Sequence, residues 1–162
     1  MQPDKVDAIL AQWARQRPDL DTAPMGVIGR IARAARLLER ELETVFAAHG
    51  LDAAGFDVLA TLRRSGSPFL LSASALADAM MLARSSTTSR IDRLEAAGLV
   101  ARIPDDADGR GIGVSLTVAG LAVIEEAVAA HVANEARLLA GLPPAVRDRL
   151  SADLRALLAT LE

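Results

Sequence analysis

The sequence contains no cysteine and few aromatic residues, and both absences exclude classes of protein. Without cysteine there are no disulfides, zinc knuckles, iron–sulfur clusters or thiol nucleophiles. His49 and His131 are far apart, so we predict no metal site and no cofactor. Aromatics make up 2% of the 162 residues. Because strands favour β-branched and aromatic residues, an interior of Ala and Leu predicts packed helices rather than a β-sandwich.

The chain also lacks a long apolar run and any catalytic constellation. No stretch of about 18 uncharged apolar residues is present, and the charged residues of 1–7 are not followed by an apolar run of the length that a signal peptide needs. We therefore expect a soluble, cytoplasmic protein with no membrane partner. No nucleophile–base pair, phosphate loop or metal cluster is visible, so we do not expect an enzyme. The formal net charge of −3 argues, at first sight, against a nucleic-acid partner.

Apolar residues recur at helical spacing along most of the chain. Proline and glycine mark the breaks, and Asp, Ser and Thr stand at the expected helix starts. Two short strands, 99–103 and 112–116, flank a turn at 105–111. The predicted fold is mainly α with a small β-hairpin. With their capping and stop residues, the expected helices are 4–16, 24–50, 52–66, 72–80, 84–98, 117–139 and 145–161.

The closely spaced helices 73–80 and 84–97 form a helix-turn-helix pattern, whose second helix enters the DNA major groove. On this second helix, Thr87, Ile91 and Leu94 share the inward side. The opposite side carries small hydroxyls that reach phosphates and bases without steric bulk. A solvated Ser-rich face is the alternative, but ordinary exposed faces use better helix formers. The residues predicted to contact DNA here are Arg84, Ser85, Ser86, Thr88, Ser89 and Arg93.

The hairpin turn adds an independent clue. In a winged helix-turn-helix such a turn lies along the DNA, and Arg110 is placed to enter the minor groove. Asp108, two residues earlier, is placed to brace the Arg110 guanidinium. We therefore add Asp108 and Arg110 to the predicted DNA contacts. The alternative is a surface hairpin with an ordinary ion pair, which contributes little stability.

Four segments together closely resemble the MarR family of bacterial regulators, and the resemblance extends over nearly the whole chain. It implies a winged-helix homodimer held by its terminal helices. It also implies binding to a palindromic operator in double-stranded DNA, usually as a repressor released by a small phenolic or anionic molecule. Ala83 and Arg84 depart from the family pattern, so the resemblance does not specify the exact base contacts. The four segments are LSASALA (71–77), TSRIDRLEAAGLV (88–100), DGR (108–110) and VSLTVAG (114–120).

The resemblance divides the chain into three parts. We expect residues 1–50 to form an N-terminal dimerisation arm, 51–117 the winged helix-turn-helix domain, and 118–162 the C-terminal dimerisation helices. The terminal helices carry broad apolar stripes that a small winged domain cannot cover alone. Two chains interlocking across a two-fold axis cover them. A monomer that folds its arms over its own hairpin domain is the alternative.

Three residues are candidates for an effector site. Trp13 is the only tryptophan, Asp57 interrupts an apolar run, and Arg90 lies on the flank of the second helix of the pair. This pattern resembles the urate-responsive branch of the family, which has an extra N-terminal helix. A purine-like or phenolic anion that competes for Arg90 would link the site to DNA binding. The alternative is a structural Asp57–Arg90 salt bridge, with Trp13 filling the core.

Two further functions remain open, an activator of the same fold and a winged-helix module that binds protein. An acidic or apolar face would favour the protein-binding module, but residues 79–91 contain two Arg and no acid. The negative charge is not an obstacle to DNA binding. Residues 125–162 carry four basic and six acidic groups, so much of the negative excess lies outside the predicted DNA-binding domain. A local cationic surface on an acidic protein still attracts DNA.

Overall fold

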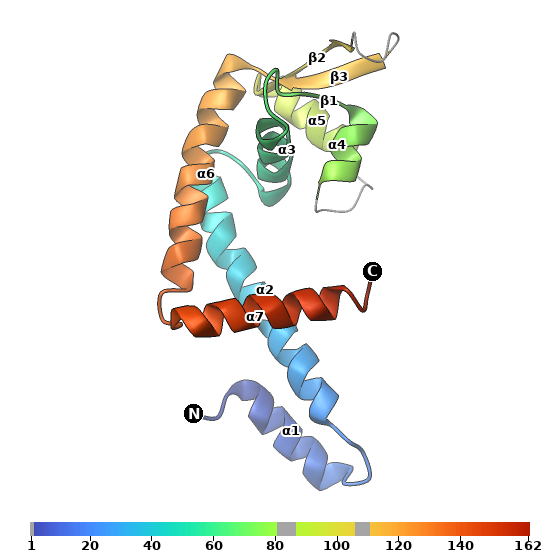
Figure 1. The fold of residues 1–162 in the computed structure, drawn as a ribbon, viewed down its shortest axis with the longest axis vertical. Helices are drawn as coiled ribbons and strands as arrows, with labels where there is room; N and C mark the ends of the chain where they lie inside the picture. Colours follow the sequence, from blue (N-terminus) through green and yellow to red (C-terminus); the bar gives the residue numbers. More distant parts are fainter. Residues whose placement is uncertain (1, 81–86, 106–110) are drawn as a thin grey trace. The chain divides into compact units, whose positions relative to one another are not determined.

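The computed structural model describes residues 2–80, 87–105 and 111–162. It confirms a mainly helical chain with one small antiparallel sheet (Figure 1). The chain divides into two compact units, residues 1–41 and 42–162, which are described separately below. In chain order the elements are α1 (Lys5–Gln16), α2 (Ala23–Ala48), α3 (Ala53–Arg64), β1 (Leu70–Ser72), α4 (Ala73–Ala79), α5 (Thr87–Ala96), β2 (Val100–Asp105), β3 (Gly111–Leu116), α6 (Val118–Leu138) and α7 (Pro144–Leu158).

The predicted helix starts are confirmed by their hydrogen bonds. At Asp52, Ser72 and Thr117 a side-chain oxygen accepts the backbone N–H three residues further on, at 2.6, 3.2 and 2.9 Å. Each bond satisfies one of the N–H groups that a helix start leaves unpaired. The segment after α2 and the end of α5 turn through Gly50 and Gly98, both with φ of +71°, a conformation that favours glycine.

The structure differs from the sequence prediction in an added strand, in the end of β2, which lies at Asp105 rather than 103, and in the end of α7. The strand β1 was not predicted, because three residues are too short to show an alternating pattern. It forms by pairing with β3, which lies between β1 and β2 in the sheet, with Leu71 opposite Val114. Helix α7 ends at Leu158 rather than 161. There the Thr160 hydroxyl donates to the Leu157 carbonyl at 2.7 Å, a local bond that competes with helix continuation.

The second unit has a dense apolar core centred on α3. Helix α3 contacts α4, α5 and α6, and in Figure 1 it lies between the orange α6 and the green α4–α5 pair. Thirteen hydrophobic residues are buried in this core, and Leu59, Leu62 and Leu76 are completely inaccessible. Such close packing fixes the short helices and the sheet in one arrangement.

The start of α6 lies unusually close to the start of β2. A Cβ atom on Gly120 would lie 1.8 Å from the Leu99 carbonyl oxygen, so only glycine fits there. The Thr117 hydroxyl donates to the Gly98 carbonyl at 2.7 Å, and the Thr117 N–H donates to the Leu99 carbonyl at 3.1 Å. These contacts join the first turn of α6 to the strand that begins the hairpin.

The first unit consists of α1 and the first part of α2. Val6 is the one hydrophobic side chain of residues 2–41 that is buried. Two glycines of α2 permit close packing here: a Cβ on Gly26 would lie 3.2 Å from Leu10 Cδ1, and one on Gly29 would lie 3.4 Å from Val6 Cγ1. The packing between α1 and α2 is therefore close but small in area.

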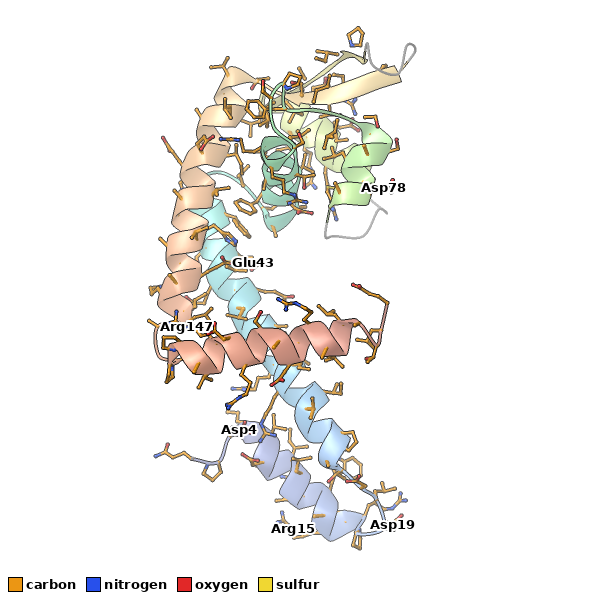
Figure 2. All side chains as sticks on the ribbon, in the orientation of Figure 1. Asp4, Arg15, Asp19, Glu43, Asp78 and Arg147 are labelled. Carbon is orange, nitrogen blue, oxygen red and sulfur yellow. The ribbon has the colours of Figure 1, made fainter. Side chains whose placement is uncertain are left out.

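Charged groups hold the start of α1. Asp4 accepts the N–H groups of Val6 and Asp7, while Asp7 accepts the N–H of Asp4, which completes a capping box. Arg30 of α2 pairs with Asp4 at 2.9 Å and with Asp7 at 2.6 Å. The Asp7 N–H, followed by Arg30, lowers the pKa of Asp4 below its usual value of 3.8. Figure 2 shows Asp4 at the start of α1.

Candidate nucleic-acid interface

Helix α5 is anchored by one face and exposes the other. Thr87, Ile91 and Leu94 are buried, with exposed fractions of 8, 2 and 7%, which confirms the predicted inward side. Thr88 and Ser89 are exposed on the opposite side. Because the buried face is fixed against the core, the exposed hydroxyls are presented by a rigid element rather than a loop.

Arg93 extends the exposed face toward the start of α3. Its guanidinium contacts the Asp52 carboxylate at 3.2 Å and the Ser89 carbonyl at 3.4 Å. The Arg93 side chain is 64% exposed, so solvent screens this ion pair. The arginine remains available at the surface as a cation beside the hydroxyls of α5.

Arg102, on β2, joins this surface although no sequence motif points to it. Its guanidinium donates to the Asp92 and Glu95 carboxylates of α5, and its N–H donates to Glu95 at 3.2 Å. The hydrogen bond with Asp92, and then that with Glu95, raises the pKa of Arg102. Asp92 is exposed, as the helical face predicts, but its carboxylate forms an ion pair with Arg102 of the hairpin. These groups come together only because α5 packs against β2 in the folded chain.

Several predicted DNA contacts lie outside the described residues. Arg84, Ser85 and Ser86 fall in the segment 81–86, and Asp108 and Arg110 fall in the segment 106–110. Their proposed contacts therefore rest on the sequence alone. The described elements on each side, α4, α5, β2 and β3, occupy the positions that a helix-turn-helix with a hairpin requires.

The three effector candidates are divided between the two units. Trp13 belongs to the first unit and is 39% exposed, so it does not fill a core as the structural alternative required. No hydrogen bond or ion pair connects Asp57 with Arg90, although both are described. Asp57 Oδ2 and Arg90 Nη1 are instead each buried without a hydrogen-bond partner. The predicted structural salt bridge between them is absent.

Arg90 lines a cavity of about 210 Å³ beside α3. Its neighbours there include Asp52, Gly55 and Arg93, whereas Asp57 is not among the lining residues.

The side chain of His131 packs against the rings of Phe46 and Phe56, with ring centroids 5.4 and 4.8 Å apart.

A metal site would show as a cluster of ligating side chains, and a membrane span as a long apolar helix. The described part of the chain contains no group of three or more His, Asp or Glu residues able to hold a metal ion. No single helix in the described ranges is long and apolar enough to cross a membrane, and α2 with α3 passes only as a bent pair, by length and composition.

A short helix pair followed by paired strands defines a winged helix-turn-helix protein. Comparison with known sequences identifies the family within this class. A sequence model of the MarR family matches residues 49–111. The HTH-type transcriptional regulator PecS from Dickeya dadantii (strain 3937) is 42% identical over 158 residues, covering 98% of this chain and 93% of PecS. The chain belongs to the MarR family of DNA-binding transcriptional regulators.

Solved structures agree with this assignment. Sco3205, a MarR family regulator from Streptomyces coelicolor solved in complex with DNA, superposes with a TM-score of 0.77 at 25% identity, covering 88% of this chain and 90% of Sco3205. BpsR from Bordetella bronchiseptica, whose DNA binding is regulated by 6-hydroxynicotinic acid, gives a TM-score of 0.68 at 30% identity, covering 80% of this chain and 91% of BpsR.

Proposed function

We propose that the protein is a homodimeric repressor that binds a pseudo-palindromic operator and is released by a small anionic aromatic molecule. The exposed face of α5 is the observation that carries this proposal. Thr88, Ser89 and Arg93 are presented there by a helix whose other face is buried. Hydroxyls and an arginine on a rigid helix suit close contact with phosphates and base edges. The relative solved with DNA, Sco3205, supports this assignment.

The uncovered apolar stripe of α7 supports a dimer. Helix α7 has no buried residue, and Leu150, Leu154 and Leu158 follow one another at helical spacing with exposed fractions of 44, 38 and 53%. Burial of such a stripe against its copy across a two-fold axis removes apolar surface from water. In this arrangement residues 1–50 and 118–162 dimerise, and residues 51–117 bind DNA.

The effector site is proposed at Asp57 and Arg90 of the second unit, and Trp13, the only tryptophan, serves as its fluorescent reporter. The two buried, unpartnered atoms of Asp57 and Arg90 support it, because buried polar groups normally have hydrogen-bond partners that a ligand can supply. Arg90 belongs to α5, so a ligand held by its guanidinium acts directly on the DNA-contacting helix. The regulation of BpsR by 6-hydroxynicotinic acid supports an aromatic acid as effector.

Footprinting on the DNA immediately upstream of the protein's own gene tests operator binding. A dimer should protect two half-sites about 10 bp apart, one turn of the duplex. Thr88→Glu places an anion on the exposed face of α5 and should weaken binding at least about tenfold. Gln12→Glu, at an exposed position on α1, makes the same charge change and should leave affinity unchanged. Equal affinities for the two variants would remove α5 from the interface.

Arg110 can be tested in the same way through salt dependence. If it contacts phosphate, Arg110→Ala should weaken binding and reduce the slope of log affinity against log salt by about one. Unchanged affinity and slope would remove the hairpin from the interface. Deletion of the gene should raise expression from the protected promoter. A fall in expression would identify an activator.

Titration with purines and salicylate-like acids tests the effector site. Binding should change the fluorescence of Trp13 and release the operator at the same ligand concentration. Arg90→Ala should abolish release while the protein still binds DNA. If no ligand acts and Arg90→Ala only lowers stability, the proposed effector site is wrong.

A further inference from the structure

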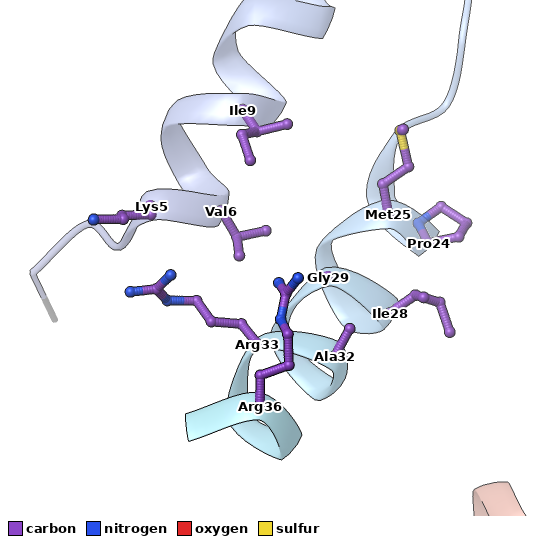
Figure 3. A pocket seen from close by; sticks show the side chains of 10 residues that line it. All are labelled: Lys5, Val6, Ile9, Pro24, Met25, Ile28, Gly29, Ala32, Arg33 and Arg36. Carbon is purple, nitrogen blue, oxygen red and sulfur yellow. The ribbon is translucent and has the colours of Figure 1, made fainter. Parts of the chain in front are cut away.

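A hollow of about 550 Å³ lies within the first unit, between α1 and the first turns of α2 (Figure 3). Its walls are largely apolar, and Ile9, Met25 and Ile28 keep exposed fractions of 50, 45 and 60% beside it. A hollow of this size matches the volume of ordinary small-molecule sites. The six apolar residues that line it are Val6, Ile9, Pro24, Met25, Ile28 and Ala32.

The charged residues of this hollow are all cationic. Lys5, Arg33 and Arg36 line it, and no acidic residue does. Figure 3 shows the Arg33 and Arg36 side chains extending from α2 toward α1. Within the described chain, neither guanidinium forms an ion pair or a hydrogen bond. The unit therefore presents two arginines to an apolar hollow without a carboxylate to balance them.

The two carboxylates at the start of α1 are already engaged elsewhere. Asp4 and Asp7 both pair with Arg30, and these three residues line a separate recess with Gln2 and Pro3. The positive charge of Arg30 is thus balanced within the protein, whereas that of Arg33 and Arg36 is not. This separation leaves an anion-binding wall next to apolar surface.

We propose that this hollow binds a small aromatic carboxylate. The carboxylate accepts hydrogen bonds from the guanidinium groups of Arg33 and Arg36, whose planar geometry suits a two-oxygen acceptor. The ring lies against the apolar wall formed by Ile9, Met25 and Ile28. Each half of the ligand then meets a surface of matching chemistry. This site is separate from the effector site proposed at Asp57 and Arg90, and it does not depend on that proposal.

Calorimetric titration of the full chain with 2-naphthoate, in the absence of DNA, tests the site directly. The acid should bind saturably. The neutral analogue 2-naphthalenemethanol has the same rings without the charge and should bind at least about tenfold more weakly, because charge-assisted hydrogen bonds are lost. Inorganic phosphate, which has no apolar part, should also bind more weakly. Equal affinity for the acid and the alcohol would overturn the proposal.

Matched variants locate the ligand. Arg33→Gln/Arg36→Gln should weaken 2-naphthoate binding at least about tenfold. Arg15→Gln/Arg17→Gln removes the same charge from exposed positions of the first unit outside the hollow, and its affinity should stay within about twofold. Ala32→Trp, at an exposed position, fills the hollow without disturbing a buried residue and should abolish binding. Circular dichroism checks that each variant is folded.

Two outcomes would assign the ligand or the hollow differently. If Arg90→Ala abolishes naphthoate binding and Arg33→Gln/Arg36→Gln does not, the acid occupies the site in the second unit and this proposal is wrong. If the full-length chain does not bind naphthoate at all, but gains binding when Leu154→Asp makes it monomeric, a second copy of the chain occupies the hollow. Operator binding by α5 is unaffected by either result, so the proposed function is tested separately.

Discussion

The two compact units are stabilised in different ways. The second unit buries thirteen hydrophobic residues around α3, whereas the described residues of the first unit bury one hydrophobic side chain, Val6. Hydrogen bonds and surface ion pairs at Asp4, Asp7 and Arg30 supplement that small contact. Apolar burial is the dominant favourable term in folding, so the two units should respond very differently to substitution and to pH.

The largest difference is expected for removal of a buried leucine. Leu59→Ala deletes a completely buried side chain and should lower the free energy of unfolding by about 3 kcal/mol. Leu20→Ala makes the same change in the first unit, where the side chain is 47% exposed, and should cost no more than about 0.5 kcal/mol. Urea unfolding followed by circular dichroism measures both. Similar losses would show that the first unit is as tightly packed as the second.

Gly120→Ala should have the next largest effect. The added methyl group would collide with the Leu99 carbonyl, which is backbone and unable to move alone, so we expect a loss of about 2 kcal/mol. Gly141→Ala is the matched control, because a Cβ there meets nothing within 4 Å. Its stability should change by less than about 0.5 kcal/mol. Equal melting temperatures for the two variants would contradict the close approach.

Asp4→Ala should affect the first unit alone. It removes the capping-box oxygen and one partner of Arg30, so amide hydrogen exchange in α1 should become several-fold faster. Exchange in α3 should not change. Asp19→Ala is the control. Asp19 lies between α1 and α2 (Figure 2) and pairs with Arg17, but it does not cap α1. Equal effects in both helices would make the units one cooperative body.

The smallest effect is expected on the amide protection of α1 when the pH is lowered. The pKa of Asp4 is lower in the folded chain than its usual 3.8, so its stabilising contribution is complete above that value and is lost as the pH falls through the lower, folded pKa. Amide protection in α1 should therefore decline below about pH 3.8, and Asp4→Asn should remove part of that decline. An identical acid profile for Asp4→Asn would assign the transition to other carboxylates, such as Asp19.

Most of the fold could be predicted because its signals are local. Asp52, Ser72 and Thr117 cap helices through bonds to residues three positions away, and helical spacing placed Ile91 and Leu94 inside. The strand β1 could not be predicted, because its three residues form a strand only through distant pairing with β3. The close approach at Gly120 likewise depends on a contact between α6 and Leu99, the residue just before β2.

The candidate sites were harder to predict than the fold. The exposed hydroxyls of α5 follow from periodicity, but Arg102 contacts Asp92 and Glu95 only after β2 has packed beside that helix. Asp57 and Arg90 have complementary charges, yet opposite charge alone does not bring two side chains into contact. The hollow of the first unit has no sequence motif, because it is defined by the shape between two helices.

The junction at Gly120 has a mechanical consequence. The first turn of α6 is in direct contact with the Leu99 carbonyl, and Thr117 donates hydrogen bonds to that carbonyl. The start of α6 therefore cannot move independently of the chain that enters the sheet. Arg102 connects the same sheet to α5 through its ion pairs with Asp92 and Glu95. A tilt of α6 is therefore expected to move the hairpin and α5 together, because neither element can change its orientation alone.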